Sequence, residues 1–275
     1  MLAVAIALLA ATPAASLELR PERAKPGDAV LLLAAGTDAA PVASVGGRPV
    51  RFWRTAGGWR GIAGLSAEQA TGPLVVTARA AEDAFEGTLL VIDPAFPSRA
   101  LKVPPRFVRP PASVRRRIAA DRRAFDAAMS RPFAPPRGEA PFAWPLVAEK
   151  TGRYGDRRTF NGRQQSQHYG LDLDAALGTP VLAANDGVVV MARDNYYAGL
   201  TVLLWHGADL YSAYFHLSRA DVKVGGVVAR GQLIGLSGGS GRATGPHLHW
   251  GVKVGGRWVD PESVLRLGAF AGPLR

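Results

Sequence analysis

Apolar residues recur along residues 17–95 in short runs separated by Gly and Pro turns. Short apolar runs bounded by turn residues are typical of β-strands. The runs follow one another at a spacing of about ten residues, which is the strand spacing of β-sandwiches. We therefore predict a small β-sandwich-like domain over residues 17–95. Its expected strands are Ala29–Ala34, Pro49–Trp53, Leu74–Ala78 and Thr88–Ile92.

A second region, residues 143–265, also has the pattern of short strands. They follow one another without long intervening helical patterns, which favours an antiparallel sheet over parallel βαβ units. The fold class is therefore mainly β, and residues 266–275 are expected to form a C-terminal tail. The expected strands of this region are Thr179–Ala183, Gly187–Ala192, Thr201–His206 and Leu210–His216.

The two β regions are joined by a proline-rich linker, residues 96–142. Apolar side chains recur at helical spacing from Val114 to Met129, so we predict a helix over Ala112–Met129. Arginines occupy its opposite side, and a charge run of this kind is typical of a solvated face.

The first 16 residues form an apolar run that ends in small residues. This pattern is typical of a secretory signal peptide, which we place at residues 1–16. The run is shorter than the ~20 apolar residues that a membrane-spanning helix needs. We therefore expect a secreted protein of the periplasm or cell envelope, with no stable membrane span after cleavage.

Charge and composition narrow the candidate chemistry. The 275 residues carry a formal charge of +11 and include no cysteine, which excludes disulfides, thiol catalysis and thiolate metal sites. A basic chain can associate with nucleic acid, an anionic membrane surface or an acidic polymer such as cell wall. The sequence has no zinc-finger, helix-turn-helix or RNP-like pattern, so no nucleic-acid partner is expected. All five histidines lie in the second β region, where we therefore place the site.

Two polar pairs are spaced so that an extended chain presents each pair on one face. His168 and Asp172 have the same parity, and so do His247 and His249. Leu248, between the two histidines, would then point into the core. Imidazole and carboxylate groups are good Zn²⁺ ligands. Taken alone, each pair is also compatible with an ordinary surface or hydrogen-bonded role.

Two other histidines are harder to assign. Ser212, Tyr214 and His216 would share one face of a strand, but a lone histidine at a strand end is usually structural. His216 becomes a candidate site residue only if its face of the strand meets the two polar pairs. His206 belongs to no such set of polar residues, and we interpret it as a structural residue near a turn.

Together these residues suit metal-assisted amide hydrolysis. A catalytic zinc site typically uses three protein ligands and leaves a fourth position for water, while spare imidazoles can accept a proton or stabilise an oxyanion. No HExxH helix is present. The glycine-rich segment from Gly235 to Gly245 fits neither a P-loop nor G-x-G-x-x-G. We interpret it as a tight connection that brings His247 to the site.

Residues 154–263 resemble the M23 family of zinc metallopeptidases, the lysostaphin/LytM-type peptidoglycan endopeptidases. The matching runs are HYGLDLDAALGTPVLAANDGVVV, AYFHLS, VKVGGVVARGQLIGLSGGSGRATGPHLHWGV and WVDP. The stretch YGDRRTFNGRQQSQH is similar to the lead-in of Gram-negative periplasmic members, although its RQQSQ lacks the proline common in relatives. The N-terminal β unit resembles the region that precedes the catalytic domain in such members.

The resemblance implies an antiparallel β domain with a narrow groove. It implies that His168, Asp172 and His249 ligate one Zn²⁺. It also implies that His247 is the general base and that His216 orients the water or stabilises the transition state. The implied partner is peptidoglycan, cut at its peptide crosslinks between D-alanine and diaminopimelate.

An alternative is a non-catalytic wall-binding module or an activator of another cell-wall hydrolase, because some family members have lost ligands. All five site positions are intact here, which favours the enzyme. We also expect the N-terminal domain or the linker to limit access to the groove. The sequence does not define an oligomeric state.

Overall fold

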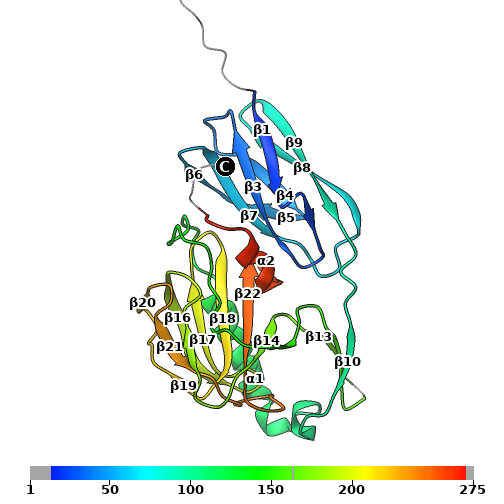
Figure 1. The fold of residues 1–275 in the computed structure, drawn as a ribbon, viewed down its shortest axis with the longest axis vertical. Helices are drawn as coiled ribbons and strands as arrows, with labels where there is room; N and C mark the ends of the chain where they lie inside the picture. The colour runs from blue at the N-terminus through cyan, green and yellow to red at the C-terminus, as the bar shows by residue number, and fades with distance from the viewer. Residues whose placement is uncertain (1–13, 163, 271–275) are drawn as a thin grey trace, which may run out of the picture.

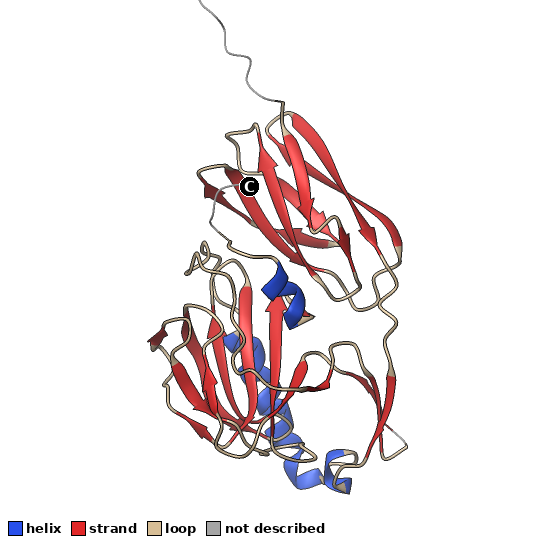
Figure 2. Ribbon diagram, viewed as in Figure 1, coloured by secondary structure: helices blue, strands red, loops and turns tan. Residues whose placement is uncertain are grey.

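The computed structural model describes residues 14–162 and 164–270, and its fold is mainly β, as predicted (Figure 2). The predicted signal peptide lies outside the described residues except for its last three positions. Of these, Ser16 already begins the first strand.

The N-terminal region is a sandwich of two sheets at one end of the molecule (Figure 1). One sheet has the strand order β1-β3-β7-β6 and the other has the order β2-β9-β8-β4-β5. The first sheet consists of β1 (Ser16–Arg20), β3 (Ala29–Ala35), β6 (Phe52–Thr55) and β7 (Gly58–Gly64). The second consists of β2 (Arg23–Ala24), β4 (Val42–Val45), β5 (Arg48–Val50), β8 (Gly72–Ala80) and β9 (Asp83–Val91).

Burial patterns explain how the sandwich packs. Along β8 and β9 buried and exposed residues alternate, because only one face of their sheet meets the core. Strand β3 is buried at nearly every position. Leu32 points into the sandwich core, whereas Leu31 and Leu33 join a second core that extends into the C-terminal region. The sandwich is therefore joined to the rest of the chain by shared apolar packing.

The prediction of one strand over Pro49–Trp53 was wrong. The chain changes sheets at Arg51: Val50 pairs with Ala43 in one sheet, and Phe52 pairs with Gly61 in the other. The strand Gly58–Gly64 was not predicted, because its three glycines hide the apolar pattern. At Gly61 a Cβ atom would lie 2.7 Å from Cγ1 of Val50, so close packing between the two sheets requires glycine there.

The linker contains the predicted helix. It begins with β10 (Ser98–Leu101) and two 3₁₀ turns, η1 (Pro105–Phe107) and η2 (Ala112–Val114), before α1 (Arg115–Ala128). Phe125 of α1 stacks on Phe215, with ring centroids 6.1 Å apart, and fixes the helix against the central sheet. The basic residues on its other side are exposed, as expected of a solvated face; they are Arg115, Arg116, Arg122 and Arg123.

The C-terminal region is built on an antiparallel sheet with the order β11-β14-β22-β18-β17-β16-β20, with β23 paired to β22. The four strands predicted here are present with shifted ends. The sheet consists of β11 (Lys150–Gly152), β14 (Leu171–Asp174), β16 (Gly187–Asn195), β17 (Gly199–Trp205), β18 (Leu210–Leu217), β20 (Val227–Val228), β22 (His247–Val254) and β23 (Arg257–Val259). Two small sheets flank it: β15 (Pro180–Leu182) with β21 (Leu233–Leu236) and β19 (Arg219–Ala220), and β10 with β12 (Arg157–Phe160) and β13 (Gln164–Gln167).

The end of β22 lies beside the sandwich, and the short helix α2 (Pro261–Arg266) lies at this junction (Figure 1). The backbone N–H of Ala29 donates to Oγ of Ser263 at 2.8 Å, which ties α2 to the first sheet. Phe270, within the predicted tail, is buried in the shared core. No helix of the described residues is long and apolar enough to cross a membrane.

Candidate metal centre

The two polar pairs meet because β14 and β22 are hydrogen-bonded neighbours. Asp172 of β14 lies opposite His249 of β22, at the start of each strand. Leu173 and Leu248, from the alternate positions of the same strands, are fully buried in the core. This alternation places the carboxylate and the imidazole together on the other face of the sheet. Gly170 allows the strands to approach, because a Cβ there would lie 2.6 Å from the carbonyl oxygen of Trp250.

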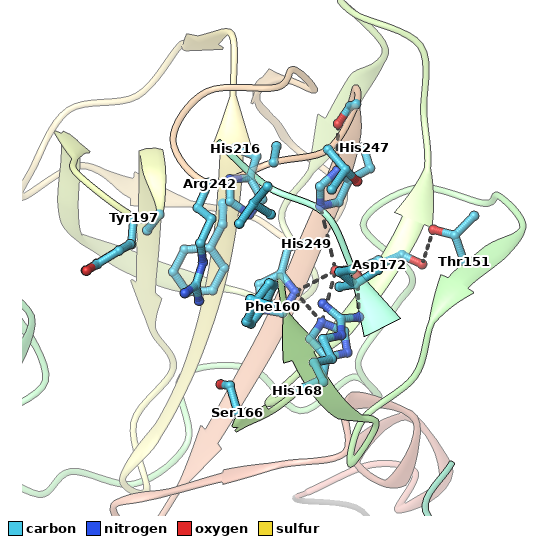
Figure 3. A pocket seen from close by; sticks show the side chains of 18 of the residues that line it. Thr151, Phe160, Ser166, His168, Asp172, Tyr197, His216, Arg242, His247 and His249 are labelled. Atoms are coloured by element: carbon cyan, nitrogen blue, oxygen red, sulfur yellow. Dashed lines mark hydrogen bonds and ion pairs between the residues drawn. The ribbon is translucent and has the colours of Figure 1, made fainter. Parts of the chain in front are cut away.

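Three ligand-type atoms converge at this point (Figure 3). Nε2 of His168 lies 3.0 Å from Oδ1 of Asp172 and 2.9 Å from Nδ1 of His249. Nδ1 of His249 lies 2.8 Å from the same Oδ1. Among the described residues, this is the one group of three His, Asp or Glu side chains able to hold a metal ion. The structure thus brings together the three residues that the sequence singled out as ligands.

Hydrogen bonds around the cluster orient its donor atoms. Nδ1 of His168 lies 2.7 Å from the carbonyl oxygen of Arg153, so its N–H donates outward and Nε2 presents a lone pair to the cluster. Burial opposes ionisation of Asp172, but the adjacent rings of His168 and His249 outweigh it and hold the pKa of this carboxyl well below its usual range. Burial lowers the pKa of His249 to about 4, so its ring is neutral at neutral pH.

This donor set fits a divalent cation such as zinc. Nε2 of His168, Nδ1 of His249 and Oδ1 of Asp172 face one another. Because the N–H of His168 is on Nδ1, only His249 could place an N–H among these three atoms. A cation at their centre would satisfy all three lone pairs at once. The hydrogen bond from Nδ1 of His168 to a backbone carbonyl is also typical of metal-ligating histidines, which donate their other ring N–H in this way.

Two more imidazoles border the cluster and are oriented in the same way. Nδ1 of His216 lies 2.7 Å from the carbonyl of Ser240, and Nδ1 of His247 lies 2.9 Å from the carbonyl of Gly245. Each N–H therefore donates to backbone, and each Nε2 retains its lone pair. The two ring centroids are 4.9 Å apart. Burial, reinforced by the neighbouring histidines, lowers the pKa of His216 to about 3.

The structure corrects one expectation about His216. Ser212 and Tyr214 do share a face, but that face lies in the core. His216 leaves the alternation because its backbone is left-handed, with a φ of 61°. As a result Phe215 and His216, although consecutive, both line the same groove. No feature of the sequence marks this turn of the backbone.

The groove has a volume of about 500 Å³ and is open to solvent. The cluster lies within it, and the sheet of β10, β12 and β13 and the loop before His247 form its walls. Arg158 of β12 was not singled out by the sequence, yet its Nη2 donates to Oδ2 of Asp172 at 2.6 Å. This bond leaves Oδ1 directed to the cluster. Arg242 also lines the groove and was likewise not predicted, because its ring contacts come from distant segments.

His206 is structural, as interpreted from the sequence. Its Nδ1 lies 2.7 Å from the carbonyl of Asp186 and its Nε2 lies 2.7 Å from Oγ of Ser212, away from the groove. The glycine-rich connection also behaves as expected. Gly238 and His247 form an isolated β-bridge, in which the backbone N–H of His247 donates to the Gly238 carbonyl at 2.9 Å. This contact holds His247 at the groove.

Comparison with known proteins agrees with this geometry. Residues 166–261 match the model of peptidase family M23, and this segment contains the whole cluster. Residues 166–261 are thus an M23 peptidase domain. It is 49% identical over 98 residues to the peptidoglycan DD-endopeptidase ShyA of Vibrio cholerae, a match that covers 36% of this chain and 23% of ShyA.

Another M23 relative is similar over nearly the whole chain. The crystal structure of a Pseudomonas aeruginosa protein assigned to peptidase M23 superposes with a TM-score of 0.65 at 29% identity, covering 89% of this chain and 95% of that one. The DD-carboxypeptidase/endopeptidase Mpg of Neisseria meningitidis is 40% identical over 97 residues, covering 35% of this chain and 22% of Mpg. This chain thus matches under a quarter of the length of these two curated relatives.

Proposed function

We propose that this M23 protein is a zinc-dependent endopeptidase that hydrolyses peptide crosslinks of peptidoglycan in the cell envelope. The convergence of His168, Asp172 and His249 beside two further imidazoles in an open groove carries this proposal. ShyA, named a peptidoglycan DD-endopeptidase, and Mpg, named a DD-carboxypeptidase/endopeptidase, share the segment around these residues. The bond proposed for this chain joins D-alanine to diaminopimelate.

His168, Asp172 and His249 would hold the zinc through Nε2, Oδ1 and Nδ1. When bound there, zinc would supply a Lewis acid and lower the pKa of a coordinated water to about 7. Arg158 would leave Oδ1 of Asp172 for the metal, because its guanidinium binds Oδ2.

His247 and His216 would divide the remaining work by their burial. His216 is buried and holds a pKa of about 3, so it stays unprotonated and its Nε2 can only accept a hydrogen bond from the attacking water. The side chain of His247 is more exposed, and its Nε2 lies 3.7 Å from Oδ1 of Asp172. The carboxylate can stabilise an imidazolium there, so His247 would be the base that takes the proton and returns it to the leaving amine.

The setting suits this substrate. The groove is open along one side of the sheet, so an extended peptide can enter. The formal charge of +11 would attract the chain to an anionic wall polymer. The sandwich lies at the end of β22 away from His247 (Figure 1). Arg99 and Leu101 of the linker line the groove, so the linker is the segment placed to limit access.

The test is digestion of purified sacculi. We expect release of uncrosslinked muropeptides, loss of that release with a chelator, and recovery when zinc is added back. The variant His249→Ala should be inactive, while Arg219→Ala, which removes an exposed arginine paired with Asp221, should match the wild type. Full activity of His249→Ala would contradict the proposal. Binding to sacculi without any release would favour the non-catalytic alternative.

A further inference from the structure

Three guanidinium groups line the groove, and two of them are neutralised by buried carboxylates. Nε of Arg99 lies 3.2 Å from Oδ2 of Asp156. Nη2 of Arg158 lies 2.6 Å from Oδ2 of Asp172 and 3.9 Å from Oδ2 of Asp156. These two arginines therefore serve the architecture of the site, and their charges are already balanced.

The third, Arg242, has no counter-ion among the described residues. Its guanidinium carbon lies 4.5 Å from the ring centroid of Phe160 and 5.1 Å from that of Tyr197 (Figure 3). The side chain is half-buried, and burial lowers the pKa of Arg242. A cation that is partly removed from water and lies against aromatic rings is stabilised further when an anion binds it.

The backbone holds Arg242 firmly in this position. Its N–H donates to the carbonyl of Tyr197 at 2.8 Å. The preceding Gly241 has a φ of 72°, and a Cβ there would lie 2.4 Å from the backbone nitrogen of Gly199, so only glycine fits. Oγ of Ser240 donates to the carbonyl of Leu217 at 2.8 Å. The arginine thus projects from an anchored loop, and little conformational freedom is lost when it binds a ligand.

The stacking also decides how Arg242 can bind. The two aromatic rings flank the guanidinium, and a group stacked in this way keeps the N–H groups along its edges free for a ligand. Edge N–H groups in a planar fork match the two oxygens of a carboxylate. Because the arginine and the His168–Asp172–His249 cluster line one groove, the carboxylate would belong to the peptide whose amide bond lies at the cluster.

We propose that Arg242 binds the α-carboxylate that the amine-side residue of the crosslink carries next to the scissile nitrogen. This inference rests on the proposed function, because a bond between D-alanine and a diaminopimelate centre has such a carboxylate. Arg242 is then a specificity-determining residue. It makes the enzyme prefer crosslinks whose amine-side carboxylate is free over those in which it is a carboxamide.

The experiment compares two synthetic crosslinked peptides that differ only in this group, a free carboxylate in one and a carboxamide in the other. A charge-assisted hydrogen bond contributes about 1.5–3 kcal/mol, so the wild type should cleave the carboxylate peptide with a kcat/KM about 10- to 100-fold higher. Arg242→Met should cleave both peptides at the rate that the wild type shows on the carboxamide. Arg230→Met, which removes an exposed arginine outside the groove, should keep the wild-type preference.

The outcomes separate the two proposals. If zinc-loaded wild type cleaves neither these peptides nor sacculi, the proposed function fails. If it cleaves both peptides equally, or if Arg242→Met keeps the preference, the role of Arg242 is overturned. If Arg242→Met cleaves neither peptide, Arg242→Lys decides, because an ammonium keeps the charge but lacks the fork. If Arg242→Lys prefers the carboxylate peptide less than the wild type does, the inference is supported. If its preference equals that of the wild type, the inference is overturned.

Discussion

Two regions of the central sheet bury imidazoles, and they use the ring nitrogens differently. Around His206 both nitrogens have a partner within 2.7 Å, and Oγ of Ser212 continues the chain of hydrogen bonds to the hydroxyl of Tyr214. Around Asp172 the rings of His168, His216 and His247 each direct Nδ1 to a backbone carbonyl, and Nε2 of His168 lies among the cluster atoms. The first region is closed and stabilises the fold, whereas the second gathers the ligand-type atoms that would hold the proposed zinc. The second ring nitrogen separates the two regions: in His206 it meets a hydroxyl, whereas in His168 it meets other ligand-type atoms.

The largest effect should follow from changing the open region. Asp172→Asn keeps the size of the side chain but removes the charge, so zinc binding and catalysis should be lost together. We expect kcat/KM on crosslinked peptide to fall about 1,000-fold or more, since a catalytic metal contributes several kcal/mol. The variant should still fold, because a neutral amide is easier to bury than a carboxylate. Its circular dichroism spectrum provides the check on folding, and near-normal activity would show that the cluster is not catalytic.

The next effect should come from His247→Gln, which removes the proposed base but none of the three cluster residues. Proton transfer by a positioned side chain contributes about 100- to 10,000-fold, so kcat should fall by this amount while zinc content stays at the wild-type level. Steady-state kinetics and metal analysis of the same preparation measure both. A parallel loss of zinc would instead make His247 a ligand.

The closed region should respond in stability and not in catalysis. His206→Ala leaves Oγ of Ser212 without its imidazole partner and opens a cavity, which should lower the free energy of unfolding by about 2–4 kcal/mol. Urea unfolding measures this loss. The folded fraction should keep the wild-type kcat/KM, so a selective loss of catalysis would move His206 into the functional group.

A related effect in the closed region is the pH dependence of stability that His206 causes. Burial lowers the pKa of His206 to about 4 from an ordinary value of 6.5. Between these values the unfolded chain binds more protons, so the stability falls as the pH falls. His206 alone should contribute about 3 kcal/mol to this fall by pH 4. Burial raises the pKa of Asp260 to about 6, so protonation of Asp260 increases the stability as the pH falls. This contribution cancels when wild type is compared with a variant that retains Asp260.

The comparison therefore uses wild type and His206→Ala, both with a chelator, unfolded in urea from pH 4 to pH 6.5. The wild type should lose stability more steeply toward pH 4, and the two should diverge most at pH 6.5. Parallel curves would mean that His206 does not titrate differently in the folded chain.

Sequence patterns could predict whatever depends on regular alternation. The two polar pairs fall on β14 and β22, whose inward positions Leu173 and Leu248 fix the faces. Alternation failed where the backbone departs from an extended strand, as at Arg51 between two sheets and at His216 with its left-handed φ. No local pattern encodes these departures.

The two arginines of the groove were beyond prediction for a different reason. Arg158 reaches Asp172 from a neighbouring hairpin, and Arg242 is defined by the rings of Phe160 and Tyr197, which lie far from it along the chain. Basic residues are numerous in this sequence, 33 in all, so charge alone marks neither. Only the tertiary structure shows that, of the groove arginines, Arg99 and Arg158 have carboxylate partners while Arg242 has none among the described residues.

The central claim is that His168, Asp172 and His249 together hold the catalytic zinc. Its most direct test is the zinc content of the purified protein after dialysis against a weak chelator. Wild type should retain one zinc ion per chain, and His249→Ala should retain almost none while its unfolding in urea remains cooperative. An equal zinc content in the two proteins would contradict the claim.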